Sequence, residues 1–304
     1  FTKLGDVLLA QGNLEGARRS FEQSLELRQR LAAREPEHTG WQRDMSVSLE
    51  RLGDVLFEQG NLEGARRSFE QSLDIAQRLA AREPEHTGWQ RDLSVSLIKL
   101  GDVLRAQGNL EGARRSFEQS LEVLQRLAAR EPEHTGRQRD LSVSFLKLGD
   151  VLLAQDNLEG ARRSFEQSLE VLQRLAAREP EHTGRQRDVS VSLERLGNVL
   201  GAQGNLEGAR RSLEQSLELR QRLAAREPEH TGWQTDLILS QAKIASMLAS
   251  GSASERTQAV SLLTQAQATL RRLAADSRLT HVQQHQWLPA IEGLLQELKH
   301  DEPS

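Results

Sequence analysis

The sequence predicts an all-α, helix-turn-helix repeat solenoid, and three observations support this fold class. One pattern recurs with a period of 48 residues: Leu-Gly-Asp-Val-Leu begins at Leu4, Leu52, Leu100 and Leu148, and Leu-Gly-Asn-Val-Leu begins at Leu196. The composition favours helices, with only 7 prolines, 4% aromatic residues and no tyrosine. Apolar residues within each unit fall at helical spacing. A fixed period of this length is typical of stacked helical hairpins.

The first helix of a unit is predicted to begin at Thr39. The stretch Thr39-Gly40-Trp41-Gln42 fits a capping box, with Thr39 as N-cap and Gln42 reaching back to it. Gly60 is expected to end this helix. Its apolar face is expected to carry Met45, Leu49, Leu52, Val55 and Leu56.

The second helix is predicted to begin after Asn61, which can cap it. It should end near Glu83, because a residue that precedes proline avoids the α region. Its apolar face carries Leu62, Ala65, Phe69, Leu73 and Leu79. Each unit is therefore predicted to be an antiparallel pair of helices of about 20 residues each.

These residues resemble the tetratricopeptide repeat (TPR). The family pattern of Leu-Gly, then Ala-x3-Phe, then Pro is matched by Leu52-Gly53, by Ala65-x3-Phe69 and by Pro84, although leucine replaces two aromatic positions. The unit is longer than the family's 34 residues, by about two turns in each helix. The resemblance implies a right-handed superhelix in which Gly53 lets the two helices approach closely.

The C-terminal part departs from the repeat. A degenerate sixth unit begins at Ile244, and Thr280-x-x-Gln283 is predicted to begin a capping helix that Pro289 kinks or restarts. We therefore expect a repeat array over residues 1–279, with units starting near 4, 52, 100, 148, 196 and 244, and a capping helix and tail over 280–304. The first unit reads as truncated, and without an initiator Met the chain is expected to be part of a longer protein.

Composition and motifs argue against several functional classes. The chain has no cysteine and a formal charge of -4, which excludes thiolate chemistry and disfavours single-stranded RNA binding or other nucleic-acid binding. No apolar run is long enough to span a membrane. His281 and His285 have a spacing that can share a metal, but no third ligand is evident. We expect no enzyme activity, no cofactor, no metal, no membrane association and a cytoplasmic location.

Differences among the copies indicate a candidate binding surface on the first helices. One variable position reads Thr2, Glu50, Ile98, Leu146 and Glu194, and another, seven residues later, reads Leu9, Phe57, Arg105, Leu153 and Gly201. Between them lie Asp6, Asp54, Asp102, Asp150 and Asn198, and Arg43, Arg91, Arg139 and Arg187 lie seven residues before the stripe. In the family this stripe faces a concave groove, so the predicted partner-binding residues are Asp54, Phe57, Ile98, Asp102, Arg105, Leu146, Asp150 and Leu153. Alternatively, each aspartate simply pairs with the basic residue three positions before it.

The predicted function is a non-catalytic protein-interaction scaffold, whose partner segment has apolar anchors and basic neighbours. A second hypothesis is a sensor or assembly arm of a larger bacterial signalling protein that carries a protease-like, TIR or NTPase module elsewhere. The acidic positions disfavour the carboxylate clamp with which some relatives hold chaperone tails. Because Trp41, Trp89 and Trp233 alternate with Arg137 and Arg185, this position is predicted to form a half-exposed ridge.

Overall fold

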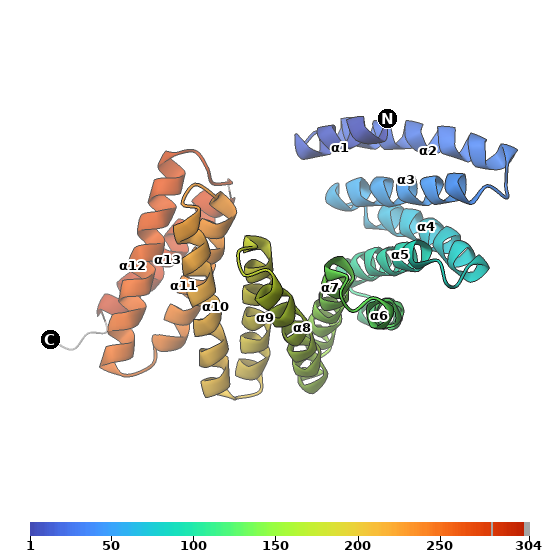
Figure 1. Cartoon of the computed structure of the whole chain (residues 1–304). Coiled ribbons are helices and arrows are strands. Elements are labelled where there is room, and N and C mark those ends of the chain that lie inside the picture. Colours follow the sequence, from blue (N-terminus) through green and yellow to red (C-terminus); the bar gives the residue numbers. More distant parts are fainter. Residues whose placement is uncertain (281, 301–304) are drawn as a thin grey trace. The chain divides into compact units, whose positions relative to one another are not determined.

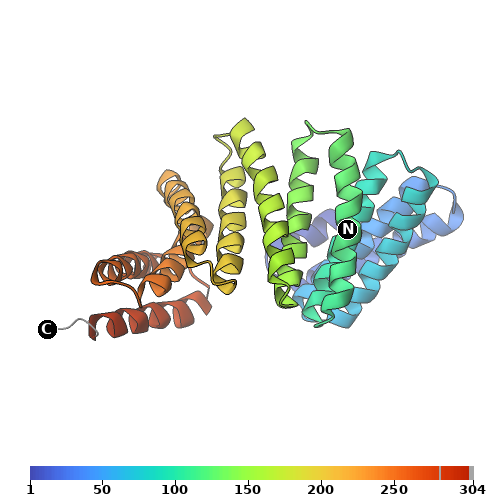
Figure 2. The same cartoon turned by 90° about the horizontal axis from the view of Figure 1, so that it is seen from below.

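The computed structural model describes residues 1–280 and 282–300, and their regular secondary structure is helical throughout. The chain forms two compact units, Phe1–Ser164 and Phe165–Ser304, which divide within one helix. Within each unit, consecutive helices pack side by side and run antiparallel (Figures 1 and 2). The predicted all-α helix-turn-helix repeat is confirmed, with thirteen α-helices in the described residues.

Helix bounds repeat in step with the sequence. The first helices of the pairs are α1 (Thr2–Ala10), α3 (Thr39–Glu58), α5 (Thr87–Ala106), α7 (Thr135–Ala154), α9 (Thr183–Ala202) and α11 (Thr231–Leu248). The second helices are α2 (Leu14–Arg34), α4 (Leu62–Arg82), α6 (Leu110–Arg130), α8 (Leu158–Arg178), α10 (Leu206–Arg226) and α12 (Ala253–Ala275). A π-helical segment (Gln283–Trp287) leads into α13 (Leu288–His300).

The turn within the α3–α4 hairpin is built as predicted. Gly60 adopts a φ of +76°, a conformation that glycine adopts without a steric penalty. The Asn61 side chain then accepts a hydrogen bond of 3.0 Å from the backbone N–H of Gly64 and caps α4. The second helix ends at Arg82, one residue before the Glu-Pro dipeptide.

The predicted start of the first helix is wrong by one residue. His38, not Thr39, is the N-cap of α3, and its Nδ1 accepts a hydrogen bond of 3.2 Å from the backbone N–H of Trp41. Gln42 donates to the carbonyl of Pro36 instead of closing a capping box. The same histidine cap begins α5, α7, α9 and α11.

Close packing inside the α3–α4 hairpin depends on a glycine. A Cβ added at Gly53 would lie 2.5 Å from Cε1 of Phe69, whose ring is buried between α3 and α4. Ala65 is fully buried beside it. The predicted role of Gly53 in letting the two helices approach is therefore confirmed.

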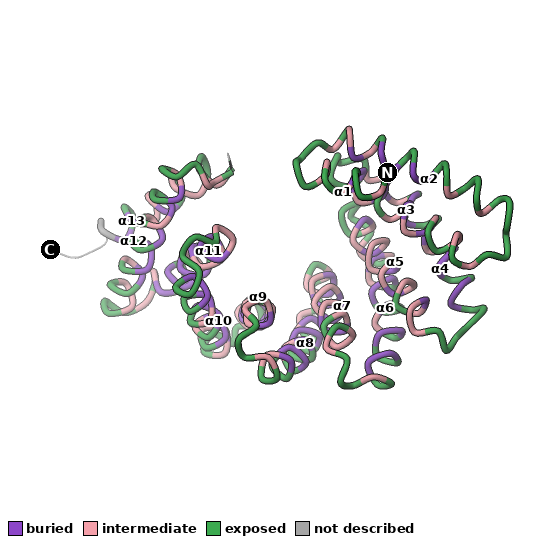
Figure 3. Tube along the Cα trace, turned by 45° about the horizontal axis from the view of Figure 1, so that its top comes forward, coloured by how far each residue is buried: buried purple, intermediate pink, exposed green. Residues whose placement is uncertain are grey.

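Each unit buries apolar residues of its own, and buried segments recur along its helices between exposed ones (Figure 3). In the first unit the core runs from Ala17 and Phe21 to Val103. In the second unit Ile291, Leu295 and Leu298 of α13 pack against the helices of the last hairpin.

The start of the C-terminal segment is capped as predicted, because Thr280 and Gln283 exchange hydrogen bonds between side chain and backbone. The π-helical segment lies directly before Pro289, which has no N–H to donate. The boundary at 279/280 stays a prediction. Residue 281, which carries the first histidine of the possible metal pair, and the side chains of Lys299 and His300 lie outside the described structure.

Candidate partner-binding groove

The first helices of the first unit share one surface, because α5 contacts both α3 and α7. All eight predicted partner-binding residues lie on these three helices. Phe57 and Arg105 are exposed, and the other six are half-buried. We call this face, carried by α3, α5 and α7, the first-helix surface.

A hollow opens on this surface at the junction of the first two complete repeats. Its volume is about 250 Å³, and we call it the Phe57 hollow. It is lined by Leu9, Asp54, Phe57, Glu58, Phe69, Lys99 and Asp102. Phe57 is 37% exposed, while Phe69 belongs to the core.

Three of the eight predicted residues therefore come together in this hollow: Asp54, Phe57 and Asp102. The remaining five do not line it. They are Ile98, Arg105, Leu146, Asp150 and Leu153. The site is thus one local concavity, where the apolar side chains of Leu9 and Phe57 lie beside charged ones.

The aspartates of the surface pair with lysines of the following repeat. Lys99 donates a hydrogen bond of 2.6 Å to Asp54, and Lys147 donates one of 2.7 Å to Asp102. The basic partner lies 45 residues after each aspartate and not three before it. The alternative prediction was thus right that the aspartates are paired but wrong about which residues pair with them.

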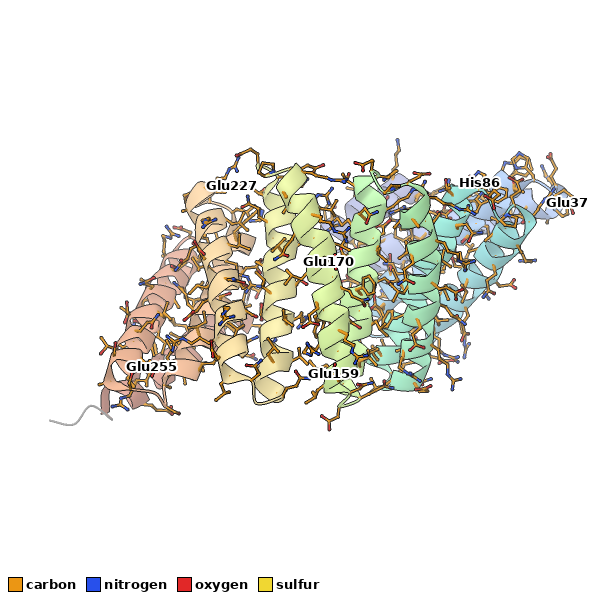
Figure 4. The ribbon with its side chains drawn as sticks, turned by 60° about the horizontal axis from the view of Figure 1, so that its bottom comes forward. Glu37, His86, Glu159, Glu170, Glu227 and Glu255 are labelled. Carbon is orange, nitrogen blue, oxygen red and sulfur yellow. The ribbon has the colours of Figure 1, made fainter. Side chains whose placement is uncertain are left out.

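The arginines that precede the stripe also join successive repeats. Arg43 pairs with Asp92 at 2.5 Å, and Arg91 pairs with Asp140 at 2.7 Å. At the loop end of the hairpins, Arg82 pairs with Glu37 at 3.0 Å. Figure 4 shows Glu37 and His86 at this end of the first unit and Glu159 at the opposite end. Charged groups on the first-helix surface are therefore largely neutralised by the neighbouring repeat.

Glu50 differs from these paired carboxylates. Its Oε1 accepts hydrogen bonds of 2.6 Å from Ser96 and 3.3 Å from Ser72. Its Oε2 has no hydrogen-bond or ion-pair partner among the described residues and is not fully buried. The Arg43 guanidinium, which pairs with Asp92, acts on Glu50 through its charge alone. Burial raises the pKa of Glu50, and the nearby Asp92 and Asp54 add to this effect.

Sequence reasoning placed Glu50 at a variable position but did not select it as a site residue. The sequence feature that could have identified Glu50 is Glu194, which occupies the same position three repeats later. Its Oε1 accepts from Lys243 at 2.6 Å, and its Oε2 accepts from Arg220 at 2.5 Å. Burial alone would raise the pKa of Glu194, but the two cations bring it below its usual range.

The predicted half-exposed Trp/Arg ridge is wrong for three of its members. Trp89 is 8% exposed, Trp233 is similarly buried, and Arg185 is 9% exposed. The Trp89 ring stacks on the capping His86 at a centroid distance of 4.2 Å. Arg185 instead pairs with Glu179 at 3.2 Å. This position accommodates either residue, because Trp89 stacks on a histidine ring there and Arg185 pairs with a carboxylate.

Within residues 1–280 and 282–300, no three histidine, aspartate or glutamate side chains gather closely enough to hold a metal ion. The described helices include none with the length and apolarity needed to cross a bilayer.

Comparison with known structures identifies proteins with the same fold. BtubC (BKLC) from P. vanneervenii is 18% identical, with a TM-score of 0.66 over 88% of this chain and 94% of that protein. The apo form of RapI is 12% identical, with a TM-score of 0.61 over 98% and 96%. The Rap conjugation gene regulator of plasmid pLS20, in complex with the Phr* peptide, is 16% identical, with a TM-score of 0.51 over 98% and 73%. No curated protein matches the chain in sequence.

These structures share the fold at low sequence identity, whereas sequence models of protein families show family membership. One model described as tetratricopeptide repeat matches residues 44–126, 92–174 and 140–222. A second model of the same description matches residues 2–80. Together they cover most of the chain, in register with the 48-residue period, so the chain belongs to the tetratricopeptide repeat family.

Proposed function

We propose that the chain is a non-catalytic interaction scaffold that holds a segment of a partner protein on the first-helix surface. The observation that carries this proposal is the Phe57 hollow, a concavity of about 250 Å³ with an exposed aromatic ring at its edge. Apolar surface that the fold leaves in a concavity favours binding of an apolar side chain. The tetratricopeptide repeat fold supports a protein-interaction scaffold in general, and the hollow is where we propose that the partner is held.

The charges around the hollow favour a particular partner. Asp54 and Asp102 line it, and each is held by a lysine. A segment with an apolar anchor and a basic neighbour would bury the Phe57 ring while its cation stays near carboxylates. A terminal carboxylate would meet these same acidic groups, so a chaperone-tail clamp is disfavoured here. The Rap regulator of pLS20 holds a peptide in a related fold, which is consistent with peptide binding by helical arrays of this length.

Selection from displayed random peptides tests the proposal. Peptides of about twelve residues are selected on the wild-type chain, and their affinities are then measured for Phe57→Ser. We expect apolar residues to be enriched, and we expect Phe57→Ser to weaken binding about 5–30-fold, which corresponds to about 1–2 kcal/mol for one anchor contact.

Leu206→Ser is the matched control, because Leu206 is a large apolar residue that is 67% exposed and lies outside the hollow. It should leave the affinity unchanged. Selected peptides that bind wild type and Phe57→Ser equally, with both chains folded, would place the binding surface elsewhere.

A further inference from the structure

Glu50 and Glu194 occupy the same position of their repeats, but their surroundings differ in two residues. Next to Glu194 lies Arg220, whose equivalent beside Glu50 is Ala76. One turn after Glu194 the chain has Asn198, where the repeat of Glu50 has Asp54. Both differences affect which cations reach the glutamate.

The first difference removes an arginine. Arg220 is buried and donates to Glu194 Oε2 at 2.5 Å, and it also donates to Ser240 of the next first helix at 2.6 Å. Ala76 has no donor to offer. The two serines that contact Glu50 bind only its Oε1.

The second difference redirects a lysine. Lys243 donates to Glu194 at 2.6 Å because the neighbouring Asn198 carries no charge to compete for it. The equivalent Lys99 donates to Asp54 instead, also at 2.6 Å. Glu50 therefore loses both of the cations that neutralise Glu194.

We infer that Glu50 is the cation-recognition residue of the first-helix surface and takes an arginine or lysine side chain of the bound partner segment. Its carboxylate is oriented by Ser72 and Ser96 on Oε1, and Oε2 is left for an incoming N–H donor. The inference rests on the proposed function. It also shifts cation recognition from Asp54 and Asp102, which already hold lysines, to a carboxylate that holds none.

The positions on α3 set the spacing of the ligand. Glu50 lies two turns before Phe57 on the same face, a separation of roughly 10 Å along the helix. An extended peptide covers that distance in about three residues. The partner segment should therefore carry its basic residue about three positions from its apolar anchor.

A set of synthetic peptides of about ten residues tests the inference. Each peptide has one Phe or Leu anchor and one Arg at an offset of one to five residues on either side, and a matched set has citrulline, which is uncharged, in place of Arg. Binding is measured by fluorescence anisotropy. We expect the wild-type chain to prefer Arg over citrulline by about tenfold, most strongly near an offset of three.

Glu50→Gln should abolish this preference while it retains an oxygen for the two serines. Glu70→Gln is the matched control, because Glu70 is exposed on α4 and does not line the hollow, and it should retain the preference. Ala76→Arg gives a second test: it should reproduce the Arg220 contact inside the chain, occupy Glu50 and abolish the preference as well. Melting curves verify that each variant is folded.

The outcomes separate this inference from the proposed function. Binding that depends on Phe57 but does not distinguish Arg from citrulline, or a preference that survives Glu50→Gln, would overturn the inference and leave the proposed function standing. If no peptide shows binding that depends on Phe57, the proposed function fails and the inference fails with it.

Discussion

Lys99 and Asp54 form an ion pair across the junction of two successive repeats, with Nζ 2.6 Å from Oδ1. The pair is partly buried and lies at the Phe57 hollow, to whose lining both residues contribute. Glu50 lies near Asp54 and forms no ion pair among the described residues, although the charge of Arg43 acts on it, so Lys99 sits where two neighbouring carboxylates could compete for its ammonium group. The arrangement predicts that the two ends of the pair respond differently to substitution.

Asp54→Asn should cost little stability. The substitution recreates the local sequence at Asn198, where the lysine turns to the glutamate instead, so Lys99 should move to Glu50. Lys99→Met should cost about 1 kcal/mol, because it leaves the partly buried Asp54 without its cation and beside the like-charged Glu50. Urea unfolding of both variants measures the difference. Equal losses would show that Glu50 does not compete for Lys99.

Gly53→Ala should destabilise the chain by about 1–3 kcal/mol, because its Cβ would overlap the buried Phe69 ring and force the ring or the helices to shift. Gly201→Ala is the matched control, since its Cβ would lie 3.7 Å from Ala209 and make an ordinary contact. That change should stabilise the helix by about 0.5–1 kcal/mol. The account of hairpin packing would be wrong if both variants shifted the unfolding midpoint in the same direction.

Most of the fold could be predicted from the sequence, because the 48-residue period gives the order and the length of the helices. The Gly60-Asn61 turn, the Glu-Pro stops and the Gly53 contact with Phe69 are local features with well-defined steric causes, and each is found where it was predicted. The predicted N-cap is wrong because threonine is a common capping residue and histidine is not, whereas Thr39 is already the first residue of α3 and His38 caps it.

The site was less predictable because its contacts cross from one repeat to the next. Helical spacing suggests partners three or four residues apart, whereas Lys99 reaches an aspartate 45 residues away. Burial of Trp89 and Arg185 was missed for a similar reason. Exchange of Trp for Arg suggests exposure unless the stacked His86 and the paired Glu179 are known.

His86→Ala should cost about 1 kcal/mol, because the backbone N–H of Trp89 would lose its side-chain acceptor, Nδ1 of His86, at the start of α5 and keep only the His86 carbonyl. His86→Asp should restore most of that loss, since an aspartate oxygen caps a helix well. Thermal unfolding of the two variants checks the role of the histidine. Identical melting of His86→Ala and the wild-type chain would show that the cap contributes nothing measurable.

The pH dependence of stability should reveal the carboxyl group of Glu50. Burial raises the pKa of Glu50 above the ordinary value of 4.5. At pH values just above 4.5, the folded chain therefore still holds a proton on Glu50 that the unfolded chain has released. Its contribution to the free energy of unfolding therefore falls as pH rises through the window above 4.5.

The amide introduced by Glu50→Gln cannot ionise. The free energy of unfolding of this variant, relative to that of the wild-type chain, should therefore increase from about pH 4 to neutral pH. Urea unfolding at several pH values measures this difference. A constant difference across the range would contradict a raised pKa at Glu50.

The central claim, that a partner segment docks on the first-helix surface at the Phe57 hollow, is tested most directly by photo-cross-linking. A selected peptide carries a benzophenone group in place of its apolar anchor, and the labelled residues of the wild-type chain are identified by mass spectrometry. We predict labelling of α3 and α5 at the hollow, between Asp54 and Glu58 and around Lys99. Labelling confined to the second helices, or to the loops that precede His38 and His86, would contradict it.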